Sequence, residues 1–486
     1  VDMSATIIHH GHIRLLKKAS EYGDVIVGLT SDEEIQKKKG YKPELDFNSR
    51  KEILESVKYV KEVLQTSWKL DNDTLEKYNI DLLVHGDDNS NDIQKGKLLI
   101  FPRTKGVSSS EIRKRSSEII GHVKRNILLN PGPATTTNSV KMAQLVADIC
   151  PREREFGDLM QFISLELTKF VANIDEYSTV LFGGSGTSVV ESVLSSVVPY
   201  DKQILIVNNG AYGKRMCEIV KAYNIDSVEF TSSSIDPINL IELERVLKEN
   251  NGKISHLAVI HNETTTGLLN NLKNIGKLAK KYNLELIVDA MSSYAAIPID
   301  MKTDNIHYLL ASSNKNIQGM AGVSFVISNI ASLQKLKRIK PRNFYLNLYA
   351  QYSNFIKNHQ MRFTPPVQTL YALKQAIIET KEEGVENRYN RYSKSWEVLT
   401  SRLRELGLKY LVEDKYHSKI ITSIFIPKGI DFNLMHDYFY NKGFTIYPGK
   451  VSNYDTFRIA NIGEIDSVDI ENFLTEFKFY LEKSAI

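Results

Sequence analysis

The sequence has little of the residue types that mark special classes of protein. Its 486 residues include only two cysteines, Cys150 and Cys217, too few for a disulfide framework or a cysteine-rich zinc site and typical of a reducing compartment. With 13 prolines and 26 glycines it is neither proline- nor glycine-rich. No apolar run approaches the length of a membrane-spanning helix and no signal peptide is visible, so we expect a cytoplasmic protein without a membrane partner.

A strong excess of one charge is also absent. The net charge is only +4 and the basic residues are dispersed, which argues against a nucleic-acid surface but leaves nucleotide binding open. The composition, 42% hydrophobic and 25% charged, is that of a globular protein, and a chain of 486 residues is expected to form two or three domains. Because the chain begins at Val1 without a methionine, we expect the start of a first strand to be missing there.

One lysine stands apart from the other charged residues. Lys315 follows an apolar, strand-like run that ends at Ser312, and no other charged side chain lies between Asp304 and Lys335. A lone lysine is more often a side chain that reaches solvent from a buried loop than a reactive group. The function of Lys315 therefore depends on what else the sequence provides.

An aspartate precedes this lysine at the end of another apolar run. Residues 284–293 predict a buried strand with Asp289 at its carboxyl end, where open α/β sheets place ligand-binding groups. An isolated buried charge is very costly, so this carboxylate must be paired, hydrogen-bonded or bound to a metal. The pair fits pyridoxal phosphate chemistry, in which a lysine forms a Schiff base with the cofactor aldehyde and an aspartate keeps the pyridine nitrogen protonated.

A glycine-rich segment supplies a third part of the same pattern. Residues 181–191 begin a helix, whose free N–H groups and dipole can hold a phosphate together with the hydroxyls of Ser185 and Thr187 around Gly186. A lone glycine-rich turn is weak evidence. The cradle, the aspartate and the lysine, in this order, are together strong evidence for a pyridoxal phosphate enzyme.

Eight short motifs after residue 128 carry a resemblance to a known family. The motifs are Asn130–Pro133, Cys150–Asp158, Asn208–Met216, Glu263–Gly267, Asp289–Ser293, Ser313–Gly319, Ile446–Ser452 and Phe457–Glu464. Over this stretch the sequence resembles the 2-aminoethylphosphonate:pyruvate transaminases, which are class V aminotransferases with the type I pyridoxal phosphate fold. The resemblance implies an α/β protein at 128–486, with a large domain at about 140–375 and a smaller α+β domain at about 376–486.

The resemblance also implies which side chains surround the cofactor. Lys315 and Asp289 would be catalytic and pyridoxal 5'-phosphate would be the cofactor. Tyr212 would stack on the pyridine ring, Thr264 would bond the ring hydroxyl and Asn314 would lie beside the cofactor. Without the resemblance, Tyr212 is one of 24 tyrosines and could equally be an ordinary buried ring.

Two further residues imply an assembly and a substrate. Thr364 resembles the threonine that reaches the cofactor phosphate of a neighbouring subunit, which implies a homodimer with its sites at the interface. Arg458 resembles the arginine that binds the anionic group of the substrate, a task suited to its planar fork, although a lone strand arginine more often forms a structural ion pair. The implied reaction moves an amino group between 2-aminoethylphosphonate or phosphonoacetaldehyde and pyruvate or alanine, with Lys315 as acid and base and with ping-pong kinetics.

The first part of the chain, residues 1–120, alternates apolar and helical stretches and predicts a small Rossmann-like sheet. A charged linker is expected at 121–127. We expect strands at residues 24–30, 80–86 and 98–101 and helices at residues 13–22, 49–57 and 73–78.

Two segments of this part are suited to bind phosphate. His9, Gly11 and His12 lie at the start of a helix, so that both imidazoles and the free N–H groups can meet a phosphate. The alternative is one capping histidine and one that faces solvent. A basic loop that leads into a serine-rich helix start, residues 103–113, is a second cradle.

These two cradles resemble those of the glycerol-3-phosphate and phosphocholine type of cytidylyltransferase, and most closely the cytidylyltransferase-like domains found alongside phosphoenolpyruvate mutases. The resemblance implies that CTP enters with Mg²⁺ and that catalysis consists of positioning and charge stabilisation. His9 and His12 would stabilise charge on the α-phosphate and Lys42, in the Lys37–Pro43 loop, would contact phosphates. Arg103, Ser108 and Ser109 would hold the triphosphate.

Two departures from this family stand out. Its usual aspartate three residues before the first motif histidine is Thr6 here, and the tryptophan that usually follows the Gly-Asp-Asp turn is Asn89, in a shortened segment up to Pro102. Asp87 and Asp88 can equally be residues that cap a turn. The acceptor of this part, and its activity, are therefore open.

Three hypotheses combine the two parts. In the first, a bifunctional enzyme of phosphonate biosynthesis makes 2-aminoethylphosphonate and couples it to CMP. In the second, only the transaminase is catalytic, and the first part senses nucleotide or serves assembly. In the third, the transaminase uses another phosphorylated aldehyde or ketone.

Overall fold

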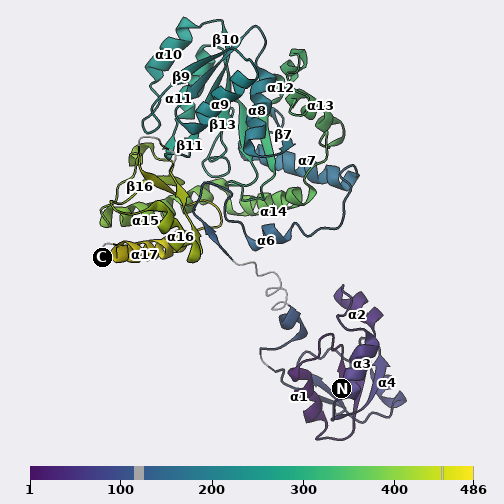
Figure 1. Ribbon diagram of the computed structural model, residues 1–486. Coiled ribbons are helices and arrows are strands. Elements are labelled where there is room, and N and C mark those ends of the chain that lie inside the picture. Colours follow the sequence, from purple (N-terminus) through teal and green to yellow (C-terminus); the bar gives the residue numbers. More distant parts are fainter. Residues whose placement is uncertain (105, 114–124, 450, 452–453, 485–486) are drawn as a thin grey trace. The chain divides into compact units, whose positions relative to one another are not determined.

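The structure is a computed structural model that describes residues 1–104, 106–113, 125–449, 451 and 454–484. The chain divides into two compact units, Val1–His122 and Val123–Ile486 (Figure 1). Part of the expected linker at 121–127 therefore lies outside the described residues, while residues 127–128 already form a strand of the C-terminal unit. In the described part of the chain, no helix is long and apolar enough to cross a membrane.

Two parallel sheets form the N-terminal unit. Strands β1, β2 and β3 pair in parallel in this order, and β4 pairs in parallel with β5. Val27 and Leu29 of β2 are fully buried, and Leu16 and Leu54 bring helices α1 and α3 onto the same core. The elements are β1 (Asp2–Met3), α1 (His10–Ala19), β2 (Val25–Thr30), α2 (Asp32–Lys39), α3 (Phe47–Glu55), β3 (Val60–Thr66), α4 (Asn72–Lys77), β4 (Leu83–Gly86) and β5 (Leu98–Phe101).

Strand β3 and helix α2 were not expected from the sequence. Four of the seven side chains of β3 are polar and only Val63 is buried, so the strand lacks the continuous apolar run of its neighbour. Helix α2 buries a single side chain, Ile35, and begins because the Ser31 hydroxyl accepts a hydrogen bond from the Glu34 amide. The expectation of a loop from Lys37 was wrong, because α2 continues to Lys39.

A seven-stranded sheet dominates the C-terminal unit. Its strand order is β7-β15-β14-β13-β10-β8-β9, and β15 alone runs antiparallel to its neighbours. The central strands are buried along almost their whole length, because helices cover both faces of the sheet. The strands are β7 (Tyr177–Gly183), β8 (Gln203–Asn208), β9 (Ser227–Thr231), β10 (Ile254–Ile260), β13 (Glu285–Asp289), β14 (Ile306–Ser312) and β15 (Val323–Asn329).

The remaining elements of the sheet domain are a short hairpin and the covering helices. Helices α7, α10, α11 and α14 contribute to one core, and α8, α9, α12 and α13 to the core on the other face. The elements are α6 (Asn138–Met142), α7 (Arg154–Lys169), α8 (Gly186–Val197), α9 (Ala211–Ala222), α10 (Leu240–Glu249), β11 (Asn262–Glu263), β12 (Leu268–Leu269), α11 (Leu272–Lys281), α12 (Ile330–Lys335), η1 (Leu336–Arg338), α13 (Leu348–Asn358) and α14 (Val367–Glu383).

A further hydrophobic core lies in the last part of the chain. It joins Leu129, from the chain just before the sheet domain, to a small antiparallel sheet and to rings of α16 and α17 such as Phe439 and Phe473. The elements are β6 (Ile127–Leu128), α15 (Val385–Glu405), η2 (Asp414–Tyr416), β16 (Ile421–Phe425), α16 (Phe432–Asn441), β17 (Phe444–Thr445), β18 (Tyr447–Pro448), β19 (Thr456–Ala460) and α17 (Ser467–Ser484).

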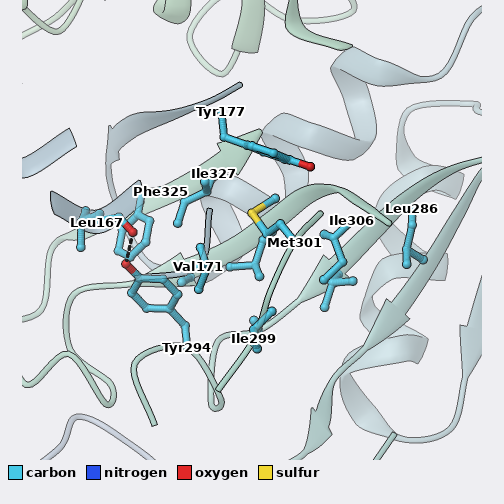
Figure 2. Close-up of a cluster of buried hydrophobic side chains, with 14 of the residues drawn as sticks. Leu167, Val171, Tyr177, Leu286, Tyr294, Ile299, Met301, Ile306, Phe325 and Ile327 are labelled. Atoms are coloured by element: carbon cyan, nitrogen blue, oxygen red, sulfur yellow. Dashed lines mark hydrogen bonds between the residues drawn. The ribbon is translucent and has the colours of Figure 1, made fainter. Parts of the chain in front are cut away.

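A buried tyrosine shows how polar atoms enter the main core. The side chain of Tyr294 packs edge-on against Phe325, and its hydroxyl donates a hydrogen bond of 2.6 Å to the Leu167 carbonyl (Figure 2). A buried hydroxyl without a partner would be costly, so this bond allows a large ring to fill the core.

Removal of a core side chain of the sheet is expected to destabilise the C-terminal unit. Ile287 of β13 is fully buried, so Ile287→Ala should lower the free energy of unfolding by about 2–5 kcal/mol. Ile241 is 80% exposed, so the same change there, Ile241→Ala, should cost within about 0.5 kcal/mol. Urea unfolding followed by circular dichroism measures both, and equal losses would contradict this account of the core.

Candidate active sites

The amine of Lys315 is buried in the C-terminal unit. The lysine follows β14 in a turn, and its Nζ donates a hydrogen bond of 2.6 Å to the Pro131 carbonyl. Burial lowers the pKa of Lys315 to about 8, against the nearby charge of Asp289, and the cations Arg458 and Arg215 lower it further. The lysine is therefore held as a partly neutral and hence nucleophilic amine near neutral pH.

A glycine leaves room for this amine. Gly132 has φ +130°, and a Cβ added there would lie 2.3 Å from the Nζ of Lys315. Any side chain at this position would displace the lysine. Gly132 therefore lines the space that the Lys315 amine occupies.

The carboxylate of Asp289 ends the neighbouring strand. β13 and β14 are parallel neighbours, with Asp289 opposite Leu310, and Oδ1 of Asp289 accepts a hydrogen bond of 2.9 Å from the Met291 amide. Burial raises the pKa of Asp289 to about 6, while the charges of Arg215 and Lys315 lower it. The carboxylate is still ionised at neutral pH and fits a protonated pyridine nitrogen.

The start of α8 has the features of a phosphate cradle. Ser185 precedes the helix and its side chain does not cap it, so the hydroxyl does not occupy the free N–H groups. A Cβ at Gly186 would lie 2.6 Å from the Met291 sulfur, so only glycine allows this approach. The Thr187 hydroxyl accepts a 3.4 Å hydrogen bond from Arg215, which brings a positive charge to the cradle.

Two charged side chains near Asp289 were not assigned a role from the sequence. Arg215 lies one helical turn after Tyr212, with its guanidinium 5.0 Å from the centre of that ring. Glu263 is fully buried, and burial raises its pKa to about 7. Its Oε1 accepts a 2.6 Å hydrogen bond from the Thr265 hydroxyl, whereas a Cβ at Gly210 would lie 2.4 Å from its Oε2. Both residues lie in motifs of the resemblance, which is the only signal that pointed to them.

Arg458 is almost completely buried in β19. Its Nε donates to the Pro448 carbonyl at 3.0 Å and its Nη1 to the Thr264 carbonyl at 3.1 Å. Its Nη2 is buried without a hydrogen-bond partner within the described residues. Two of the donors thus fix the guanidinium, and the unpaired one fits an anionic ligand.

The other predicted residues of this site have mixed placements. Thr264 is buried and its carbonyl orients Arg458, as described above. Asn314 joins two segments, because its carbonyl accepts a 3.0 Å bond from the Ala134 amide and its Oδ1 one from the Ser312 hydroxyl. Thr364 is exposed in the single chain.

The N-terminal unit has a cleft of about 500 Å³. Six of the residues predicted to bind nucleotide line it, and Lys39 lines it in addition. Lys42 is exposed and is absent from the described lining, because the end of α2 brings Lys39 there instead. The six residues are His9, Gly11, His12, Arg103, Ser108 and Ser109.

The two imidazoles of the cleft are held by the start of α1. The Nδ1 of His9 accepts a hydrogen bond of 3.2 Å from the Gly11 amide, and the Nδ1 of His12 accepts one of 3.3 Å from the His9 amide. The rings stack with their centres 3.9 Å apart. An accepting Nδ1 leaves the proton on Nε2, so each ring presents an N–H that is not used by the helix.

Positive charge is concentrated around these rings. Burial lowers the pKa of His12 to about 3, and His9, Lys39 and Arg103 lower it further. The pKa of His9 is also lowered, chiefly by burial, and burial and neighbouring cations lower that of Lys39. Such mutual repulsion is relieved by a polyanion, so the cleft fits a phosphate-rich ligand.

The polar groups at the rim of the cleft have structural partners as well. The Ser108 hydroxyl accepts a bond from the Glu111 amide, and the Ser109 hydroxyl donates one to the Ile7 carbonyl. Thr6 is buried and its hydroxyl accepts a 2.6 Å bond from Arg113. Among the described residues there is no group of three or more acidic, histidine or cysteine side chains that could hold a metal ion. Asp88, paired with Arg103 at 3.6 Å, is one carboxylate of the cleft that could meet a Mg²⁺ brought in by a nucleotide.

Comparison with known families matches both units. Residues 151–458 match the model of aminotransferase class V, which is more than half of the chain. Residues 5–115 match the model of cytidylyltransferase-like proteins.

Curated relatives match the larger part of the chain. A 2-aminoethylphosphonate–pyruvate transaminase of Bacillus cereus (strain G9842) is 43% identical over 352 residues, which are 72% of this chain and 96% of the relative. A bifunctional phosphonoacetaldehyde hydrolase/aminoethylphosphonate transaminase of Clostridioides difficile (strain 630) is 42% identical over 362 residues, which are 74% of this chain and only 56% of that relative.

Solved structures show the fold of the C-terminal unit. An alanine–glyoxylate aminotransferase from Nostoc sp. has a TM-score of 0.69 at 24% identity and covers 73% of this chain and 94% of its own. A pyridoxamine–pyruvate aminotransferase from Mesorhizobium loti has the same TM-score at 19% identity and covers 75% of this chain and 94% of its own. These likenesses confirm the predicted fold class.

The strand-end carboxylate, the buried amine and the open helix start are the parts that a pyridoxal phosphate enzyme requires, and the matched family has the same requirement. The chain therefore belongs to the class V aminotransferases, and its N-terminal unit is cytidylyltransferase-like.

Proposed function

We propose that the C-terminal unit transfers the amino group between 2-aminoethylphosphonate and pyruvate. The unpaired Nη2 of buried Arg458 carries this proposal, because it leaves one oriented donor for the anionic group of a substrate. Arg458 is also close enough to Lys315 to lower the pKa of the lysine amine. The curated Bacillus cereus relative, covered over 96% of its length, acts on these two compounds by its name. A guanidinium suits both the phosphonate of the donor and the carboxylate of the acceptor.

The residues of the site divide the work. Pyridoxal phosphate supplies a carbonyl for the substrate amine and a pyridinium ring that accepts electrons. Asp289 would hold the proton on the ring nitrogen, the start of α8 with Thr187 and Arg215 would hold the phosphate, and Tyr212 would cover the ring. Lys315 would attach the cofactor and afterwards move a proton between the substrate carbon and the cofactor as general acid and base.

We further propose that two chains complete each site. Thr364 is exposed and follows Phe363, whose ring stacks on that of Tyr345 at 5.0 Å. Phe344 and Tyr345 are 75% and 47% exposed. This aromatic surface next to Thr364 is suited to burial against a second copy, whose cofactor phosphate Thr364 would then reach.

Removal of the lysine amine is expected to abolish amino transfer. Lys315→Ala should lower kcat for 2-aminoethylphosphonate with pyruvate by about 10²–10⁴-fold or more, because the acid–base group is lost. Lys302→Ala removes an exposed lysine paired with Glu176 and should leave kcat unchanged within about twofold. Alanine formation measured with alanine dehydrogenase decides the matter. Activity of Lys315→Ala near the wild-type level would refute the assigned role, whereas a wild type inactive on this donor but active on another phosphorylated amine would refute only the substrate.

Mixing of two impaired variants is expected to restore part of the activity if sites are shared. In a mixed dimer of Lys315→Ala and Thr364→Ala, one site combines an intact Lys315 with the partner's intact threonine. Random exchange of subunits then yields about a quarter of the wild-type sites. Activity is measured after the subunits are mixed under mild denaturation, with each variant alone as control. A fully active monomer, shown by light scattering, would contradict the shared site.

We propose a second activity, the transfer of CMP from CTP to 2-aminoethylphosphonate, for the N-terminal unit. The fixed Nε2–H groups of His9 and His12 favour it, because two oriented neutral donors among cations suit a phosphorus centre that gains negative charge. A phosphonate oxygen would attack the α-phosphorus of CTP, the bond to the β-phosphate oxygen would break, and pyrophosphate would leave, with Mg²⁺ entering on the triphosphate. The pocket residues Arg103 and Lys39 would balance charge on the phosphates.

Loss of one imidazole is expected to slow this reaction strongly. His12→Ala should lower kcat for pyrophosphate release by roughly 10²–10³-fold and raise the KM for CTP much less, since the donor acts mainly on the transition state. His10→Ala is the matched control, because His10 is exposed and is not among the described lining of the cleft. Transamination should be unchanged in both. A wild type that binds CTP without releasing pyrophosphate would identify a nucleotide-sensing module instead.

A further inference from the structure

The hydroxyl of Tyr392 joins two segments that bear on the transaminase site. The side chain is fully buried in α15. Its hydroxyl accepts hydrogen bonds from the Gln318 side chain at 2.9 Å and from the Gly463 amide at 2.8 Å, and lies 3.3 Å from the Gly463 carbonyl. One hydroxyl has one proton and two lone pairs, so all its bonding capacity is used here.

On one side, these bonds hold the turn that carries Lys315. The Gln318 amide donates a 2.8 Å bond to the Lys315 carbonyl and closes the turn. Gln318 itself has φ +61°, an unfavourable region for a residue other than glycine, and its side chain is buried. A strained turn persists only where its surroundings hold it. Here the Tyr392 hydroxyl accepts the hydrogen bond from the side-chain amide of Gln318.

On the other side, they hold the segment that directly follows Arg458. β19 ends at Ala460, and the side chain of Asn461 donates a 2.8 Å bond to the Tyr392 carbonyl. Gly463, two residues later, bonds to the hydroxyl. The orientation of the strand that presents Arg458 is thus tied to the same tyrosine as the lysine turn.

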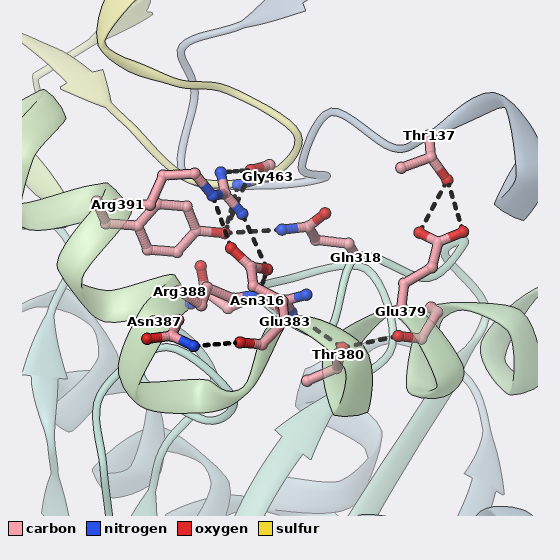
Figure 3. A network of polar contacts seen from close by, with 12 residues as sticks. Thr137, Asn316, Gln318, Glu379, Thr380, Glu383, Asn387, Arg388, Arg391 and Gly463 are labelled. Carbon is pink, nitrogen blue, oxygen red and sulfur yellow. Dashed lines mark hydrogen bonds and ion pairs between the residues drawn. The ribbon is translucent and has the colours of Figure 1, made fainter.

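Two arginines fix the start of α15, the helix that carries Tyr392, and Figure 3 shows both of them beside Glu383. Arg388 is buried, pairs with Glu383 at 2.7 Å and donates a 2.5 Å bond to the carbonyl of Asn316, next to Lys315. Arg391 pairs with Glu383 at 2.7 Å and donates a 2.9 Å bond to the Gly463 carbonyl. The junction of α14 and α15 is therefore bonded to the same two segments as Tyr392.

We infer that Tyr392 is a positioning residue, which sets the placement of the Lys315 amine relative to the Arg458 guanidinium. It touches neither group itself and acts through Gln318 and Gly463. The inference rests on the amino-transfer role of the C-terminal unit. Because a misplacement of about 1 Å can cost as much as 100-fold in rate, a hydroxyl remote from the chemistry can control both kinetic constants.

The test compares two tyrosines that each lose only an oxygen atom. Tyr392→Phe leaves the Gln318 side chain and the Gly463 amide without their acceptor, and should lower kcat/KM for amino transfer about tenfold or more, through both kcat and KM. Tyr294→Phe is the matched control. That hydroxyl is also buried but bonds only to Leu167 in the sheet core, so this variant should lose thermal stability and keep kcat/KM within about twofold.

A second variant separates the contact of Tyr392 with Gln318 from its contacts with Gly463. Asparagine tolerates positive φ, but its side chain is one methylene shorter than that of Gln318 and would not reach the hydroxyl. Gln318→Asn should therefore lower kcat and leave the KM for the anionic donor within about twofold, since the bonds of Tyr392 to Gly463 remain.

A third measurement is independent of substrate. In cofactor-free protein, the pH dependence of Lys315 labelling by acetic anhydride, read by mass spectrometry, reports the pKa of the amine. A loosened turn exposes the amine, so this pKa should shift upward in Tyr392→Phe and Gln318→Asn and stay at the wild-type value in Tyr294→Phe.

Either of two results would overturn the inference. One is a Tyr392→Phe variant whose kinetic constants match those of Tyr294→Phe. The other is an unchanged labelling profile in both turn variants. A failed substrate proposal would leave the labelling shift in place, so the two failures are distinguishable.

Discussion

The candidate site of the C-terminal unit depends on keeping an amine and a carboxylate buried near each other. Burial alone would neutralise both, raising the pKa of Asp289 and lowering that of Lys315, and each is opposed by the charge of the other. Their adjacency follows from the parallel pairing of β13 and β14, whose carboxyl ends meet at one edge of the sheet. Gly132 leaves room for the Lys315 amine, and Arg458 has an unpaired buried donor, Nη2.

The N-terminal cleft differs, since it holds Lys39 and Arg103 next to two histidines, with Asp88 as a nearby carboxylate. Burial, with a smaller effect of neighbouring cations, lowers the pKa values of His9, His12 and Lys39, and the helix start uses one nitrogen of each imidazole. Positive charge in such a cleft favours an anionic ligand, whereas the charges of Lys315 and Asp289 are of opposite sign and favour each other. The two units therefore differ in the charges that surround their candidate sites.

Much of this could be predicted from local sequence. Apolar runs indicated β2, β13 and β14, and the glycine-rich start of α8 indicated a cradle, because strand burial and helix N-termini depend on neighbours in the chain. Six of the expected nucleotide-binding residues line one cleft. Lys39 and Arg215 were missed, since surface lysines and helix arginines have no local signal that separates them from solvated charges. β3 and α2 were missed because each buries little apolar surface.

The sequence by itself determined the fold class, the family and the identities of the groups that could carry the chemistry, since periodicity and motif order are properties of the chain. Tertiary structure alone decided which groups meet. Asp289 and Lys315 are brought together by strand pairing, and Arg458 comes from a strand more than 140 residues further on (315 to 458). Tyr392 lies outside the motifs found in the sequence. Its hydroxyl reaches the lysine turn and the segment after β19 only because α15 packs against both. Contacts between segments so far apart are set by packing, and no local pattern encodes them.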